Sequence, residues 1–358
     1  MTYCVGWQTD SAAFLVADAA VTKSEPPRQT HSTFGELHPR ERDYSVEEAA
    51  LKIYRWSNLA LTCAGSATAI HLFARAVELQ LQSGKGELES IIAARRQLTG
   101  VEQFEGIAAL VWNGLPQLFR LDESGIWASV KREHAVHIGS PARRFKQFVH
   151  DTIIEVVEDN QKPEVQLACV LATCQSLTVH EYLLAEKAGG AFAGVMLDHS
   201  GTRWHPDIGY LLIDPSELTR TGDAPRGAGN SPYITCLFRH DVLFVNSPIT
   251  RHITALLTFK KETTTLEMVD QINLGLLSAH EARINCRLDF AILMSKHRPI
   301  VAVVGMGGRN TSGHLKLGVA RRLDGQEVVS ADLSPTLGNR LQGIGVPDGV
   351  PHMVLCAT

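Results

Sequence analysis

Strand-like and helix-like segments alternate in blocks over the first 213 residues, and this alternation limits the possible folds more than any other feature. TYCVGWQ (2–8) and AAFLVADAAV (12–21) are rich in β-branched and small apolar residues, which predicts adjacent antiparallel strands. LALTCAGS (59–66) predicts another strand, and a helix-like segment follows it directly. Blocks of this kind predict sheets covered by helices.

Three segments carry the apolar spacing of helices. The first (66–84) has Ser66 placed to cap its start and Gly84 just past its end, and the second would be capped by Ser140. The third runs over roughly 164–186, and residues 191–214 then predict a closing hairpin. Another hairpin is expected over 106–125, and a single strand over 127–140. The apolar positions are Ile70, Phe73, Val77 and Leu81 in the first helix, and Phe145, Phe148, Val149, Ile153 and Val156 in the second.

Two polar stretches interrupt these blocks. Residues 24–45 contain prolines and no clear periodicity, which predicts a long surface loop or insertion. A Gly/Pro-rich stretch at 219–232 predicts a linker. We therefore expect a first domain at 1–214, a linker at 215–232, and a small α+β domain of unknown role at 233–358 that contains a helix over 265–283.

Composition excludes several classes of partner. The formal net charge of −4 and the lack of a long Lys/Arg run argue against nucleic acid and anionic membranes as partners. No basic stretch precedes the first apolar segment, Asp10 interrupts that segment, and no apolar run is long enough to span a bilayer. We expect a cytoplasmic protein. Its seven cysteines are scattered and predict reduced, buried side chains: Cys4, Cys63, Cys169, Cys174, Cys236, Cys286 and Cys356.

A threonine lies directly behind the initiator methionine. A threonine hydroxyl is a weak nucleophile at neutral pH, and the backbone amine of the same residue can act as its base when the residue is the first of the mature chain. Removal of Met1 would give Thr2 that position. An ordinary strand start explains the same residue equally simply.

The residues around Thr2 resemble a known family. MTYCVGWQTDSAAFLVADAAVT resembles the start of proteasome β-subunits, and TYCV is most similar to the Anbu group of bacterial proteasome homologues. The resemblance covers about residues 2–213. It implies the N-terminal nucleophile (Ntn) hydrolase fold, an αββα four-layer sandwich, so the fold class expected for the whole chain is α+β.

The resemblance also implies roles for single residues. Asp18 falls at the acidic position of the second strand, and Lys52 in ALKIYRW at the catalytic lysine. Gly65 in LTCAGS matches the glycine whose amide binds the oxyanion, and Ser140 in VHIGS matches a supporting serine. Structural explanations stay open: a polar strand residue for Asp18, a solvated surface residue for Lys52, a helix-entry glycine for Gly65 and a helix cap for Ser140.

One motif departs from the family. An aspartate and a serine usually precede a glycine at the end of the last helix, whereas AEKAGG has Glu186 and Gly189 there. Glu186 becomes the candidate carboxylate, and the serine hydroxyl is missing. The insertion at 24–45 lies between the Asp18 and Lys52 positions, so substrate specificity is left open.

The predicted function is a threonine-type hydrolase of amide bonds, acting on peptides or proteins. The resemblance implies a homo-oligomer, as a ring or a stack, and the chemistry needs no cofactor. The histidines lack metal-ligand spacing, and VVGMGGRNTSG (303–313) lacks the glycine and lysine positions of a nucleotide loop, so we assign no metal and no nucleotide. A non-catalytic scaffold subunit with the same fold is the alternative.

Overall fold

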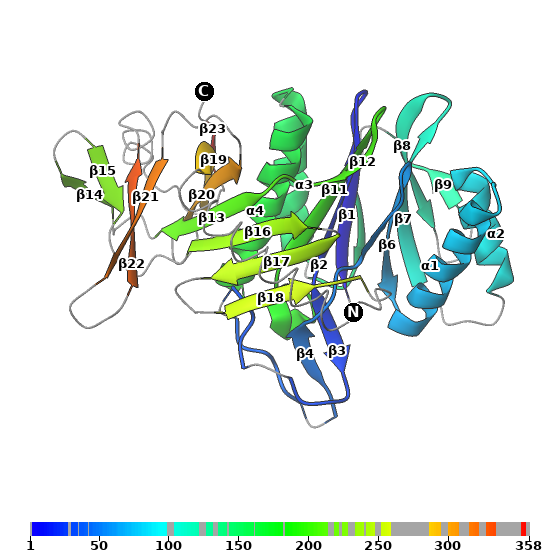
Figure 1. Ribbon diagram of the computed structural model, residues 1–358, viewed down its shortest axis with the longest axis horizontal. Helices are drawn as coiled ribbons and strands as arrows, with labels where there is room; N and C mark the ends of the chain where they lie inside the picture. The colour runs from blue at the N-terminus through cyan, green and yellow to red at the C-terminus, as the bar shows by residue number, and fades with distance from the viewer. Residues whose placement is uncertain are drawn as a thin grey trace.

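The computed structural model describes most of the chain up to residue 258 and separate strands beyond it. The described residues are 2–27, 30–34, 36–41, 43–98, 104–121, 127–131, 135–141, 143–160, 162–181, 183–213, 218–221, 224–227, 233–239, 241–247, 252–258, 286–294, 300–307, 315–321, 327–333 and 352–355. Over these residues the protein is a mixed fold with four α-helices, and every named pair of strands is antiparallel (Figure 1).

The first sheet has the strand order β10-β1-β2-β11-β12. The predicted opening pair is confirmed, since β1 and β2 are antiparallel neighbours with Val5 opposite Val16. Both strands are buried along their whole length, because one face of the sheet meets helices and the other meets a second sheet. The strands are β1 (Tyr3–Gln8), β2 (Ala13–Asp18), β10 (Val136–Gly139), β11 (Phe192–Asp198) and β12 (Gly201–Trp204).

The second sheet has the order β5-β6-β7-β8-β9. Its predicted hairpin is β7 and β8, joined at Asn113-Gly114, and both of these residues have the positive φ that a two-residue hairpin turn requires. The strands are β5 (Ile53–Arg55), β6 (Leu59–Gly65), β7 (Phe104–Trp112), β8 (Leu115–Leu121) and β9 (Trp127–Ser129).

The two faces of β6 show how the layers are built. Leu59 and Leu61 pack with α1 (Ala67–Gln82) and α2 (Glu87–Gln97), whereas Ala60, one residue away, packs with the first sheet. On the far side of the first sheet, α4 (Pro163–Glu181) contacts β2 and β11 and pairs with α3 (Arg143–Glu158). The layers run α1 and α2, second sheet, first sheet, α3 and α4 (Figure 1).

The predicted helices are largely confirmed. Ser66 caps α1 by accepting a hydrogen bond from the Ala69 N–H, and Gly84 follows the helix with a φ of +85°. In α3 the predicted apolar stripe is buried except for Phe148, which is partly buried, and the helix begins at Arg143, so Ser140 does not cap it. The third predicted helix ends earlier, at Glu181, and a 3-10 turn, η1 (Leu183–Glu186), follows it.

Two predictions about strands are wrong. Residues 127–140 form two strands in different sheets, β9 in the second and β10 in the first. The closing hairpin consists of β11 and β12 alone, because β13 (Ile208–Ile213) pairs with β16 and β20 of another sheet. Pro206 lies between β12 and β13, and a proline cannot donate to a strand ladder, which is consistent with the change of sheet there.

That other sheet has seven strands in the order β18-β17-β16-β13-β20-β19-β23. Six of its strands come from residues 233–358, where the sequence predicts a small α+β domain, whereas the helix predicted at 265–283 lies outside the described residues. A four-stranded sheet of order β14-β15-β22-β21 was not predicted. The remaining strands are β14 (Leu218–Thr221), β15 (Ala224–Gly227), β16 (Tyr233–Arg239), β17 (Val242–Ser247), β18 (His252–Leu256), β19 (Cys286–Met294), β20 (Ile300–Gly307), β21 (Leu315–Arg321), β22 (Glu327–Leu333) and β23 (His352–Leu355).

The seven-stranded sheet shares a core with the first domain. α4 contacts β13, β19 and β20 on the side that faces away from the first sheet, and residues 167–178 of this helix are buried all round. Ile208, Ile234 and Val245 belong to the same hydrophobic cluster as the strands of the first sheet. The division of the chain at 214 stays a prediction, but the pairing of β13 with β16 and this shared core both join residues from the two sides of it, and β14 and β15 lie inside the expected linker.

The insertion at 24–45 is only in part the surface loop that its polarity predicts. It begins and ends on a two-stranded ribbon of β3 (Ala20–Lys23) and β4 (Ser45–Glu48). Its two ends are largely exposed, whereas Ser32, Thr33, Phe34 and Glu36 are buried. The middle of the segment therefore packs into the molecule.

The sequence predicts reduced, buried cysteines and no apolar segment that spans a bilayer. The five cysteines whose side chains are described are free and buried, namely Cys4, Cys63, Cys169, Cys174 and Cys236. Cys286 lies in β19, and Cys356 lies outside the described residues. Among the helices described here, none combines the length and apolar character that crossing a bilayer would take.

Candidate active site

Thr2 directly precedes β1, and a hydrogen bond to its backbone carbonyl fixes its position. Its side chain is largely buried, with the residue 4% exposed, and its carbonyl oxygen accepts a hydrogen bond of 3.1 Å from the Ser140 N–H. Gly139 precedes this contact with a φ of +90°, and a Cβ atom on it would lie 1.6 Å from the Thr2 oxygen. Only glycine allows the end of β10 to approach Thr2 this closely.

Lys52 and Asp18 form a buried ion pair close to Thr2. Lys52 directly precedes β5, and Asp18 is the last residue of β2. The Lys52 Nζ lies 2.6 Å from Asp18 Oδ1, and the two side chains are 5% and 0% exposed. Asp18 also accepts hydrogen bonds from the N–H groups of Tyr3 (3.1 Å) and Gly189 (2.9 Å). The ion pair is thus anchored from three segments of the chain.

The surroundings of Asp18 shift its pKa in opposite directions. Burial raises the pKa of Asp18 above its ordinary value, while Lys52 and the N–H groups of Tyr3 and Gly189 act to lower it. The ion pair with Lys52 is the group that favours the ionised carboxylate most strongly. Removal of the lysine would therefore leave a buried acid without its main compensation.

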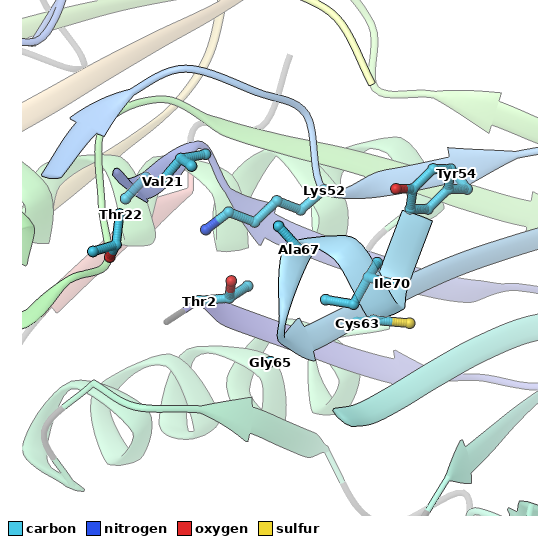
Figure 2. A pocket seen from close by; sticks show the side chains of 10 residues that line it. Thr2, Val21, Thr22, Lys52, Tyr54, Cys63, Gly65, Ala67 and Ile70 are labelled. Carbon is cyan, nitrogen blue, oxygen red and sulfur yellow. The ribbon is translucent and has the colours of Figure 1, made fainter. Parts of the chain in front are cut away.

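A pocket of about 220 Å³ opens beside these residues. In Figure 2 the hydroxyl of Thr2 and the ammonium of Lys52 point toward one another across it. The pocket is smaller than the usual site for a drug-sized ligand, so it suits a single side chain of a larger substrate. The lining residues are Thr2, Ala20, Val21, Thr22, Lys52, Tyr54, Cys63, Gly65, Ala67 and Ile70.

Gly65 lines the same pocket at the point where β6 ends and α1 begins. Its φ of +140° is a conformation that favours glycine, and Ser66 caps the helix immediately afterwards. The backbone here turns from sheet to helix next to Thr2 (Figure 2). Thr2, Lys52 and Gly65 are therefore brought to one pocket, and Asp18 lies behind Lys52.

Ser140 lies beside Thr2 as expected, but its contact differs from the expected one, and Glu186 lies on the surface. Ser140 contributes its backbone N–H to Thr2, and the residue is exposed, so the contact that the structure gives comes from the main chain. Glu186 is an exposed residue of η1. The carboxylate-binding contact from this part of the chain is made by Gly189, whose N–H donates to Asp18.

Two buried carboxylates near the site were not predicted. Glu36 accepts hydrogen bonds from the Leu184 and Gly190 N–H groups, and Glu48 accepts one from Ala191. Burial raises the pKa of Glu36 to about 8. For Glu36 the only signal in the sequence is an acidic residue in a polar insertion, and such a residue is usually solvated.

Comparison with known proteins adds a structural likeness. No family model matches the sequence, and no curated protein is found as a relative. Among solved structures, an Anbu (Gly-1) mutant from Hyphomicrobium sp. strain MC1 matches with a TM-score of 0.42 and 12% sequence identity, covering 57% of this chain and 87% of that chain.

Proposed function

We propose that this protein is a threonine-type Ntn hydrolase that cleaves amide bonds, with Thr2 as the nucleophile. The observation that carries the proposal is the pocket in which the Thr2 hydroxyl faces a buried lysine that is paired with Asp18. The order of the layers is consistent with the αββα sandwich that the sequence resemblance implies. The proposal requires that Met1 is removed, so that the amine of Thr2 is free.

In the proposed reaction the Thr2 Oγ attacks the carbonyl carbon of the substrate. The free amine of Thr2 accepts the hydroxyl proton, directly or through water, and returns it to the leaving amine. Lys52 places a positive charge beside the hydroxyl and so favours its deprotonation. The Gly65 N–H is the candidate donor to the developing oxyanion, and water then releases the acyl group from Thr2.

The pocket supports a peptide or protein as substrate, because its size suits one side chain next to the scissile bond. We propose further that the chain acts in the cytoplasm. The resemblance leads us to propose that it forms a homo-oligomer, in a ring or a stack. The two residues with supporting roles in the resemblance take other roles here. Ser140 would act through its backbone N–H, and we propose no catalytic contact for Glu186.

Hydrolysis of a fluorogenic peptide library tests this function. Thr2→Ala removes the hydroxyl, whereas Thr2→Ser keeps a hydroxyl and a small second residue that permits removal of methionine. We expect turnover by the wild type and by Thr2→Ser, and none by Thr2→Ala at unchanged oligomer size. Turnover by Thr2→Ala would remove Thr2 from the reaction, and an intact mass that retains Met1 would favour the non-catalytic scaffold.

A further inference from the structure

Three consecutive backbone N–H groups are each bound by a different buried carboxylate. The Gly189 N–H donates to Asp18 (2.9 Å), the Gly190 N–H to Glu36 (3.1 Å), and the Ala191 N–H to Glu48 (2.6 Å). The three donors lie between η1 and β11, and we refer to residues 189–191 as the amide run. The first carboxylate belongs to the ion pair with Lys52, so the amide run touches the proposed active site directly.

The other two carboxylates come from the insertion and from the strand that closes it. Glu36 is 2% exposed, and its second oxygen accepts from the Leu184 N–H at 3.1 Å. The second oxygen of Glu48 accepts from both the N–H and the hydroxyl of Thr33. The insertion and the turn before β11 are thus tied together by side-chain carboxylates.

The conformation of the amide run depends on these contacts. Gly189 and Gly190 have φ values of +110° and +69°, a region that glycine populates easily but does not hold by itself. Both residues are buried, so an N–H without an acceptor would carry the full cost of desolvation. The carboxylates fix the turn by satisfying these donors.

We propose that Glu36 is a positioning residue of the Thr2 site, which holds the amide run so that the Gly189 N–H keeps Asp18 in line with Lys52. This role rests on the proposed function. Glu36 is not among the residues that line the pocket, and it acts through the backbone from Gly190 to Gly189. The buried middle of the insertion is then a structural support of the active site.

Glu36→Gln tests the role with little change in size. The amide keeps one acceptor oxygen and places an NH₂ group against the other N–H, so one of the two contacts is lost. Glu41→Gln is the matched control, because Glu41 belongs to the same insertion and is exposed. Glu36→Asp serves as a second variant if Glu36→Gln does not fold, since the shorter side chain keeps the carboxyl group but cannot span both donors.

The first measurement needs no activity. Hydrogen exchange followed by mass spectrometry reports on peptides that cover residues 183–192. We expect faster exchange there in Glu36→Gln than in the wild type or Glu41→Gln. Equal exchange in all three proteins would overturn the proposal, because Glu36 would then not hold the turn.

The second measurement is the rate at which a peptide epoxyketone labels Thr2. We expect the rate in Glu36→Gln to fall by about 10- to 100-fold, as for other small displacements of catalytic groups, while the final labelled fraction stays the same. A merely structural role would lower the labelled fraction and leave the rate per site unchanged. An unchanged rate in Glu36→Gln would overturn the positioning role alone, whereas a wild type that is never labelled would overturn the proposed function and this role with it.

Discussion

Lys52 is a buried cation whose compensation comes from one carboxylate and whose ammonium faces the Thr2 hydroxyl. At the scale of single residues, this one side chain therefore affects both the unfolding free energy and the reactivity of Thr2. Removing one partner of a buried ion pair leaves the other uncompensated, which typically costs about 3–5 kcal/mol of unfolding free energy. A surface lysine would show neither effect.

Lys52→Met should therefore lower both the unfolding free energy and the rate of hydrolysis per folded molecule. Lys85→Met is the control. Lys85 lies between α1 and α2, its ammonium donates a hydrogen bond to Gln80 of α1, and it is not one of the residues that line the pocket. Denaturant titration and steady-state kinetics measure the two effects. A Lys52→Met protein with the wild-type rate would return Lys52 to a purely structural role.

His205 predicts a loss of stability in acid. It is buried against Phe238, and burial lowers its pKa to about 4 from an ordinary value of 6.5. Between these values the unfolded chain binds a proton that the folded protein does not, so stability falls as the pH drops from 6.5 to 4, by up to about 1.4 kcal/mol per pH unit. His205→Phe should flatten this dependence in urea titrations, whereas the same change at exposed His199 should not; equal slopes would contradict the prediction.

The predictability of the site differs from residue to residue. Thr2, Lys52 and Gly65 could be placed together from local motifs, and the structure brings them to one pocket. Glu36 could not, because its partners Leu184 and Gly190 are 148 and 154 residues away and no local pattern encodes such pairs. The position of Ser140 was predicted correctly beside Thr2, but its contact is made by a backbone group that any residue except proline could supply.

At the scale of elements, the junction of β1 with β10 depends on one glycine. Gly139 and Gly84 have nearly the same positive φ, +90° and +85°, but a Cβ atom would meet the Thr2 backbone at the first and open space at the second. Gly84→Ala should cost about 1–2 kcal/mol from backbone strain alone. Gly139→Ala should cost more and should abolish labelling of Thr2, as thermal melts and probe assays would show. Equal stability of the two variants would mean that β10 does not constrain Thr2.

Elements with strong local signals were predictable, and the pairing of some strands was not. The Asn-Gly turn between β7 and β8 and the capped start of α1 are encoded in adjacent residues. The assignment of β9 and β10 to different sheets depends on partners elsewhere in the chain, on β8 and β1. The same reason explains why β13 was placed in the wrong hairpin.

At the scale of the whole molecule, α4 contacts strands of two sheets and has no exposed residue over 167–178. A helix that is buried all round needs cover on every side. We therefore expect residues 2–207 to depend on the strands that follow them, although the sequence alone predicts an independent unit at 1–214. The contacts Arg55–Asp241 and Thr33–Thr254 add polar links across the same interface.

A chain that ends near Ser216 should be insoluble or should unfold at much lower denaturant concentration than the full chain. The truncation removes β16 and β20, between which β13 is paired, and uncovers one side of α4. Size-exclusion chromatography and circular dichroism of both proteins measure the effect. A monodisperse, cooperatively folded fragment that labels at Thr2 would show that the seven-stranded sheet is dispensable.

The site of attachment of a peptide epoxyketone tests the central claim most directly, because this reagent reacts with both the hydroxyl and the free amine of an N-terminal threonine. Intact and fragment masses of the treated full chain locate the adduct. The account predicts one adduct, on Thr2 of a chain that lacks Met1, and none on Thr2→Ala. An unlabelled wild-type protein, or an adduct on any other residue, would contradict it.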